Sequence, residues 1–145
     1  SISDDVYLAT TISTDIWGAR VDGGTRAVWS GYISNPAGAS IQQKPKLYHD
    51  GTDLVVVWED NRFLSFSGYG IFGIHLNPAS GAVVAGWYAD TTSADDDGVA
   101  LILNNYNESV GNIQIMPYGA GTAAVLIWED FRTAGEGCNL VYFGI

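Results

Sequence analysis

The chain has 145 residues, of which 47% are hydrophobic and 15% charged, and its 16 acidic and 6 basic residues give a formal charge of −10. This length fits one domain that buries a sizeable core, and the composition excludes an intrinsically disordered chain. The acidic balance argues against nucleic acid and anionic membrane as partners, because both attract clusters of Lys and Arg.

The residue types favour β-structure, since the chain has 18 Gly, 8 Tyr and 5 Trp and strands are rich in aromatic residues. No stretch of ten or more residues has uninterrupted helical periodicity, so we expect almost no helix. The longest apolar runs are far shorter than the ~20 residues of a membrane-spanning helix. The sole cysteine, Cys138, has no intrachain disulfide partner. The chain starts at Ser1 without a signal segment, which we interpret as a processed chain or an excerpt, either compatible with export.

The first forty residues are expected to form a partial repeat unit. The runs VYLATT and DIWGARV are typical of strands, and residues 15–24 resemble residues 70–81 at an offset of about 55. A repeated phrase of this kind marks a repeated structural unit.

Residues 41–90 form the one complete unit. Four β-type runs follow one another: KPKLYHD, DLVVVWED, YGIFGIHLN and GAVVAGWYAD. HDGTD and NPASG between them are turn sequences. The run LVVVW at 54–58 is apolar without alternation, which predicts a strand buried on both faces.

Residues 86–110 are interpreted as an insertion, and residues 111–145 as a second partial unit. VLIWEDFR at 125–132 repeats VVVWEDNR at 55–62 with an offset of 70, and IQIMP at 113–117 aligns with IQQKP at 41–45 with an offset of 72. Function is expected where the copies differ.

Four short antiparallel strands, repeated at intervals of 40 to 55 residues, are typical of β-propeller blades. With its WED phrase and the following YGIFGIHLNPASG, the chain resembles the WEDxR-type β-propeller-like repeats of secreted and surface proteins of prokaryotes. The resemblance covers about two and a half units and implies an all-β, blade-like fold in a single domain, as a propeller-like or two-sheet arrangement. It implies a secreted or cell-surface location but no particular ligand.

The repeated charged residues suggest a structural latch after each buried strand. An Asp can cap the backbone of a turn and an Arg can bind it through a forked guanidinium. The alternative is a repeated binding site for an anionic or sugar ligand, but repetition within one chain favours the structural role. The latch residues are Trp58, Asp60, Arg62, Trp128, Asp130 and Arg132. Glu59 and Glu129 are expected to have solvated side chains.

The insertion contains two sets of candidate ligand-binding residues. Aromatic side chains beside it suit sugar stacking, and they are Trp87, Tyr88 and Tyr106. Other aromatic residues, such as Trp17, Trp29 and Tyr32, are expected in the core or in subunit contacts. Clustered carboxylates before Gly98 could hold Ca²⁺, although an acidic loop in solvent is the alternative, and they are Asp90, Asp95, Asp96 and Asp97. Asn107 begins an N-x-S glycosylation sequon.

These features predict a non-enzymatic binding or assembly module that associates through strand edges and aromatic surfaces into a homo-oligomer or filament. His49 and His75 are isolated in the sequence, and no catalytic motif is present. A lectin-like module that binds glycans is the first alternative, and a fragment of a propeller-type hydrolase with its catalytic residues elsewhere is the second.

Overall fold

A computed structural model describes residues 5–23, 26–35, 40–62, 68–85, 98–102, 110–118, 123–130 and 139–144. Within these ranges the chain forms antiparallel strands and no helix, so no helix long and apolar enough to cross a membrane occurs in them. The expected all-β class is confirmed. The strands are β1 (Val6–Ile12), β2 (Asp15–Val21), β3 (Ala27–Ser34), β4 (Gln42–His49), β5 (Leu54–Asp60), β6 (Gly70–Leu76), β7 (Val99–Ile102), β8 (Val110–Tyr118), β9 (Ala123–Asp130) and β10 (Asn139–Gly144).

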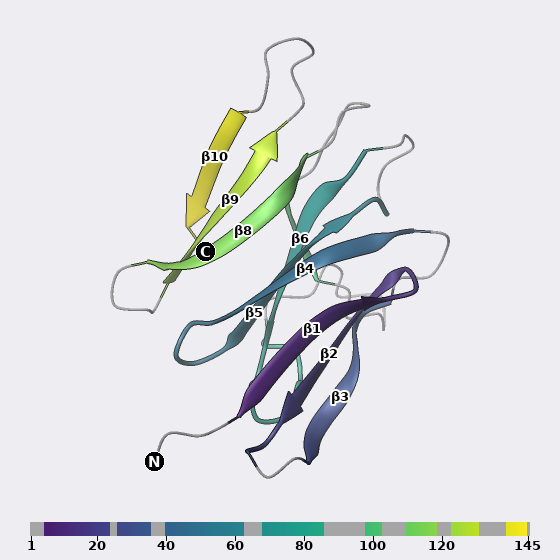
Figure 1. Cartoon of the computed structure of the whole chain (residues 1–145). Helices are drawn as coiled ribbons and strands as arrows, with labels where there is room; N and C mark the ends of the chain where they lie inside the picture. Colours follow the sequence, from purple (N-terminus) through teal and green to yellow (C-terminus); the bar gives the residue numbers. More distant parts are fainter. Residues whose placement is uncertain are drawn as a thin grey trace.

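The strands form three separate antiparallel sheets (Figure 1). The first sheet has the order β1-β2-β3, the central sheet β4-β5-β6-β7 and the third sheet β10-β9-β8. The first and central sheets begin within the units expected at 1–40 and 41–90, and the third sheet begins at Val110, the last residue of the expected insertion.

The central sheet is covered on both faces. Even-numbered residues of β5, such as Val56 and Trp58, pack with Ile16 and Ile33 of the first sheet. Odd-numbered residues, such as Val55 and Val57, pack instead with residues of the third sheet, including Leu126. All seven residues of β5 are buried, which confirms the expectation of a strand buried on both faces and explains why its apolar residues do not alternate with polar ones.

Equivalent backbone hydrogen bonds join the first sheet to the central sheet and the central sheet to the third. The N–H of Gln42, which begins β4, donates to the carbonyl of Thr14 just before β2 at 2.7 Å. The N–H of Val110, which begins β8, donates to the carbonyl of Tyr69 just before β6 at 3.2 Å. The first sheet therefore meets the central sheet in the way that the central sheet meets the third.

The fourth strand of the central sheet differs from the sequence prediction. The described part of GAVVAGWYAD makes one isolated bridge, between Val83 and Leu76, and the paired strand is β7, inside the predicted insertion. Both segments are antiparallel to β6 on the edge that β5 leaves open. Two segments, one before and one within the predicted insertion, thus share the fourth-strand position beside β6. Both segments are apolar, so the hydrophobic pattern alone could not show which of them forms the paired strand.

Strand register also corrects the alignment of IQQKP with IQIMP. Gln42 pairs with Asp60, and Val110 pairs with Asp130, so the two strands correspond at an offset of 68. A bulge follows in each strand, and Lys44 and Asn112 both have a φ of 53° there. The offset of 72 matched similar letters four residues out of register.

Candidate functional site

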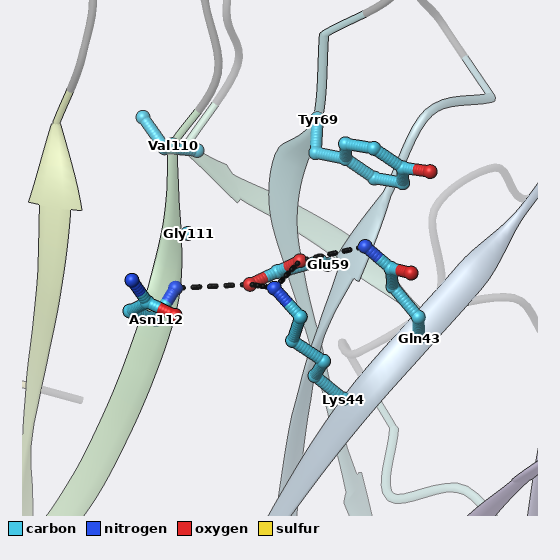
Figure 2. Close-up of a pocket in the computed structure, with 7 residues that line it drawn as sticks. All are labelled: Gln43, Lys44, Glu59, Tyr69, Val110, Gly111 and Asn112. Atoms are coloured by element: carbon cyan, nitrogen blue, oxygen red, sulfur yellow. Dashed lines mark hydrogen bonds and ion pairs between the residues drawn. The ribbon is translucent and has the colours of Figure 1, made fainter.

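A pocket of about 250 Å³ lies at the boundary between the central and third sheets. Glu59 lines this pocket, precedes Asp60 at the end of β5 and is only 2% exposed. The expectation of a solvated Glu59 is therefore wrong, because this side chain points at the third sheet and is covered by it. Figure 2 shows the carboxylate surrounded by the other residues that line the pocket, which are Gln43, Lys44, Tyr69, Val110, Gly111 and Asn112.

The Glu59 carboxylate accepts hydrogen bonds from two sheets (Figure 2). Gln43 Nε2 donates to Oε2 at 2.9 Å, and Lys44 Nζ lies 3.1 Å from the same oxygen. From the third sheet, the backbone N–H of Asn112 donates to Oε1 at 2.9 Å. The carboxylate thus satisfies the backbone group that the β8 bulge removes from strand pairing.

Gly111 allows this close approach of the two sheets. A Cβ atom built there would lie 3.0 Å from Glu59 Oε1, which is tighter than ordinary packing. Since the carboxylate oxygens bind protein donors, the pocket resembles a polar joint between sheets more than a site for a general base.

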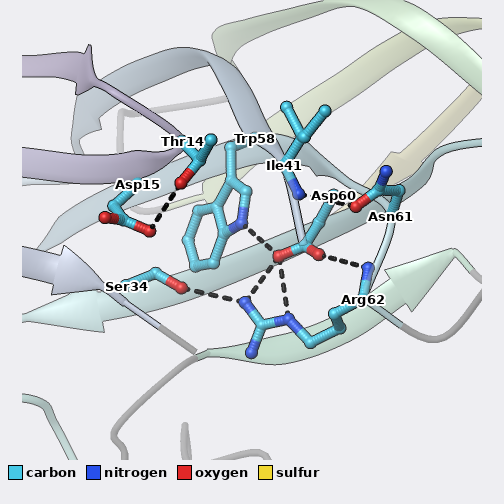
Figure 3. Close-up of polar contacts among 8 residues, drawn as sticks. All are labelled: Thr14, Asp15, Ser34, Ile41, Trp58, Asp60, Asn61 and Arg62. Carbon is cyan, nitrogen blue, oxygen red and sulfur yellow. Dashed lines mark hydrogen bonds and ion pairs between the residues drawn. The ribbon is translucent and has the colours of Figure 1, made fainter. Parts of the chain in front are cut away.

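Of the predicted latch residues, Trp58, Asp60 and Arg62 contact one another (Figure 3). Asp60 Oδ2 accepts hydrogen bonds from Trp58 Nε1 at 3.0 Å and from Arg62 Nε at 2.8 Å. Its Oδ1 accepts the backbone N–H of Arg62 at 2.8 Å. The two side chains are buried, with 8% exposure for Arg62 and none for Asp60.

The Arg62 guanidinium extends the latch to the neighbouring sheet. It donates to Ser34 Oγ of the first sheet at 2.8 Å (Figure 3). It also stacks over the Phe72 ring, 4.6 Å from the centroid. The arrangement satisfies a buried charge and joins two sheets, as a structural element does. A ligand would have no access to the carboxylate between these sheets.

The second copy of the phrase is described only in part. Trp128 is 3% exposed and Asp130 is 5% exposed, both in β9, while Arg132 lies outside the described residues. Trp128 Nε1 has no hydrogen-bond partner within the described ranges, unlike Trp58 Nε1. The two copies therefore share burial, but their indole hydrogen bonds differ.

The remaining predicted site residues lie outside the part of the chain that the structure describes. They are the aromatic residues Trp87, Tyr88 and Tyr106, the acidic residues Asp90, Asp95, Asp96 and Asp97, and the sequon at Asn107.

Sequence reasoning also missed a cluster of Asp50, Asp53 and His75 at the opposite end of the central sheet. HDGTD was recognisable as a turn, but only the pairing of β5 with β6 places His75 beside it.

Comparison with known proteins assigns no family to the chain. No family model matches it, and no curated protein and no solved structure is significantly similar.

Proposed function

We propose that this protein is a non-enzymatic assembly module whose copies stack sheet on sheet, head to tail. In this arrangement the outer face of the first sheet of one copy packs on the outer face of the third sheet of the next. The occupant of each open face is a second copy of this chain. The proposal keeps the secreted or cell-surface location that the resemblance to WEDxR repeats implies.

The observation that carries the proposal is that both outer faces expose apolar side chains. On the first sheet, Leu8 is 49% exposed and Tyr32 is 57% exposed, and Val6 and Ile12 of β1 are also exposed. On the third sheet, Met116 is 43% exposed and Tyr118 is 67% exposed. Apolar sheet faces open to water are typical of interaction surfaces.

Strand register supports the choice of partner. Thr10 pairs with Trp17 in the first sheet as Trp58 pairs with Phe72 in the central sheet, so Leu8 takes the position of Val56. Val56 is fully buried by the first sheet. The open face of the first sheet therefore corresponds to a face that a neighbouring sheet covers within the chain.

The third sheet supplies the complementary surface. Its residue Ile127 corresponds to Val57 at the offset of 70 that relates the two WED phrases, and Val57 is buried against the third sheet. The two open faces thus correspond to the two surfaces that pack together wherever neighbouring sheets meet within the chain. Contacts of this heterologous kind produce rings when their rotation closes and filaments when it does not.

The contact proposed here lies on sheet faces, whereas the sequence suggested strand edges and aromatic surfaces. The faces can repeat the sheet-on-sheet packing already present twice in the chain. The buried carboxylates of Glu59 and Asp60 bind protein donors, which favours a non-enzymatic role for this end of the sheets.

A mixing experiment tests the direction of assembly. Leu8→Glu places a charge on the first face, and Met116→Glu places one on the third. We expect the unmodified chain to form oligomers in light scattering and each variant alone to be monomeric. An equimolar mixture should form a heterodimer, because each variant keeps the face that the other has lost.

Ala79→Glu is the matched control, since Ala79 is exposed in the turn after β6 and lies outside both faces. This variant should oligomerise like the unmodified chain. A monomeric unmodified chain at millimolar concentration would overturn the assembly proposal. If one variant self-associates on its own and the mixture forms no heterodimer, the contact is symmetric and the head-to-tail arrangement is overturned.

A further inference from the structure

Three side chains with metal-ligating atoms meet at the end of the central sheet far from Glu59. Asp50 and Asp53 belong to the turn between β4 and β5, and His75 lies on β6. One ligating atom from each residue lies within 4.8 Å of the other two, and all three residues are half-buried. The cluster is therefore neither a loose group of surface acids nor part of the apolar core.

The turn orients Asp50 toward the cluster. Asp50 Oδ1 accepts the backbone N–H groups of Thr52 and Asp53, each at 2.7 Å, and neither bond uses Oδ2. Gly51 permits the turn through its φ of 99°. The neighbouring His49 accepts the N–H of Gly51 on its Nδ1 at 2.9 Å and is not one of the three clustered residues.

The first sheet has a different pair at the corresponding positions. Register places Arg20 where the central sheet has His75, and Asp5 where it has Asp53. Arg20 forms an ion pair with Asp5 at 2.8 Å. In the central sheet the imidazole of His75 stands at the position of the Arg20 guanidinium. An imidazole nitrogen can bind a metal ion, whereas a guanidinium cannot.

The distances suit a small divalent ion. His75 Nδ1 lies 3.6 Å from Asp53 Oδ2, while two ligands of a tetrahedral ion at about 2.1 Å are themselves about 3.4 Å apart. Imidazole with carboxylate favours zinc and related first-row metals, whereas Ca²⁺ prefers oxygen ligands alone. All three ligating atoms lie within 4.8 Å of one another, so closing each remaining pair by at most about 1.4 Å completes three such contacts.

We propose that Asp50, Asp53 and His75 form a binding site for a divalent first-row transition metal ion. The three residues leave at least one coordination position for water or another ligand. The bound ion ties the β4–β5 turn to β6 and stabilises the folded chain in proportion to its occupancy. This site is separate from the two outer faces, so its failure leaves the assembly proposal standing.

Titration of the chain with Zn²⁺ tests the site. We expect one strong site by isothermal titration and a rise in melting temperature, with a much weaker response to Ca²⁺ and Mg²⁺. His75→Gln and Asp53→Asn should each weaken the affinity by about tenfold or more, since each removes a direct ligand. His49→Gln is the matched control, because it removes the only other imidazole and should leave the affinity within about twofold.

Two further measurements keep the test decisive if His75→Gln folds poorly. Imidazole NMR signals of the unmodified chain should shift on Zn²⁺ addition for His75 and not for His49. Replacing Asp95, Asp96 and Asp97 by Asn should leave the strong site intact. The proposal is overturned if Zn²⁺ gives no strong site, if His49→Gln removes it, or if loss of the acidic run removes it.

Discussion

The carboxylate of Glu59 in the central sheet accepts the backbone N–H of Asn112 in the third sheet at 2.9 Å. The bond spans two sheets and satisfies a donor that the β8 bulge withdraws from pairing. Glu59 →Ala should therefore lower the free energy of unfolding by about 3 kcal/mol, because it leaves buried donors without an acceptor. Urea denaturation measures the loss. Glu129→Ala is the matched control, since Glu129 is only half-buried and accepts a hydrogen bond from the Asn112 side chain rather than its backbone N–H. An equal loss in both variants would contradict a special role for Glu59.

The latch between Asp60 and Arg62 should behave as a coupled pair. Arg62→Ala leaves the carboxylate of Asp60 buried without its cation, so we expect a loss of about 3 to 5 kcal/mol in the free energy of unfolding. Arg62→Lys should lose less, because it keeps the charge but not the forked bonds or the stacking on Phe72. A double-mutant cycle with Asp60→Ala measures the coupling. Additive losses would show that the two side chains act independently.

Gly98 is packed against the indole of the latch and adopts a backbone conformation that favours glycine. Its φ is 80°, and a Cβ atom there would lie 2.4 Å from Trp58 Cη2 and 2.9 Å from the carbonyl oxygen of Gly73. Gly98→Ala should cost about 2 to 4 kcal/mol from backbone strain and overpacking together. Gly51→Ala is the control, since φ is 99° there but nothing lies within 4 Å of the new Cβ. Its cost should be about 1 to 2 kcal/mol, and equal melting temperatures of the two variants would rule out the steric contribution.

Acid should remove a stabilising contribution of Asp50. Partial burial favours a higher pKa for this carboxyl, but the N–H groups of Asp53 and Thr52 and the charges of His75 and His49 oppose it, and the resulting pKa is lowered. The ionised carboxylate therefore stabilises the fold above the unfolded-state pKa of about 3.9. This stability is lost as the pH falls through the lower folded-state pKa.

The comparison of the unmodified chain with Asp50→Asn measures this effect, because the amide still accepts the turn's hydrogen bonds. Urea denaturation in the presence of a chelator should show a stability difference near neutral pH that shrinks below about pH 4. A difference that grows on acidification would show the opposite pKa shift.

Several local features could be predicted from the residue pattern. The WED phrase and its apolar run predicted a strand buried on both faces, and the order of Trp58, Asp60 and Arg62 predicted residues that could meet beyond it. These contacts depend on residues two to four positions apart, and strand geometry alone brings such residues together. The burial of Glu59 could not be predicted in this way, because the sheet that covers it comes from residues more than fifty positions later in the chain.

Strand register determined the correspondence between β4 and β8, which similarity of residues in the sequence did not. The matching of IQQKP with IQIMP selected the wrong offset, because short apolar and amide-rich phrases recur by chance, whereas the pairing of Gln42 with Asp60 and of Val110 with Asp130 is unambiguous. The same register identified β7 as the fourth strand of the central sheet.

The sequence by itself determined that the chain is all-β and that the WED phrase at 58–60 ends a buried strand. These properties follow from local periodicity, turn residues and the exclusion of apolar side chains from water. Only the tertiary structure decided which faces are covered and which remain open, and only it brought His75 to Asp50 and Asp53. The physical reason is that sheet stacking and strand register depend on contacts between residues far apart in the chain, which no local pattern specifies.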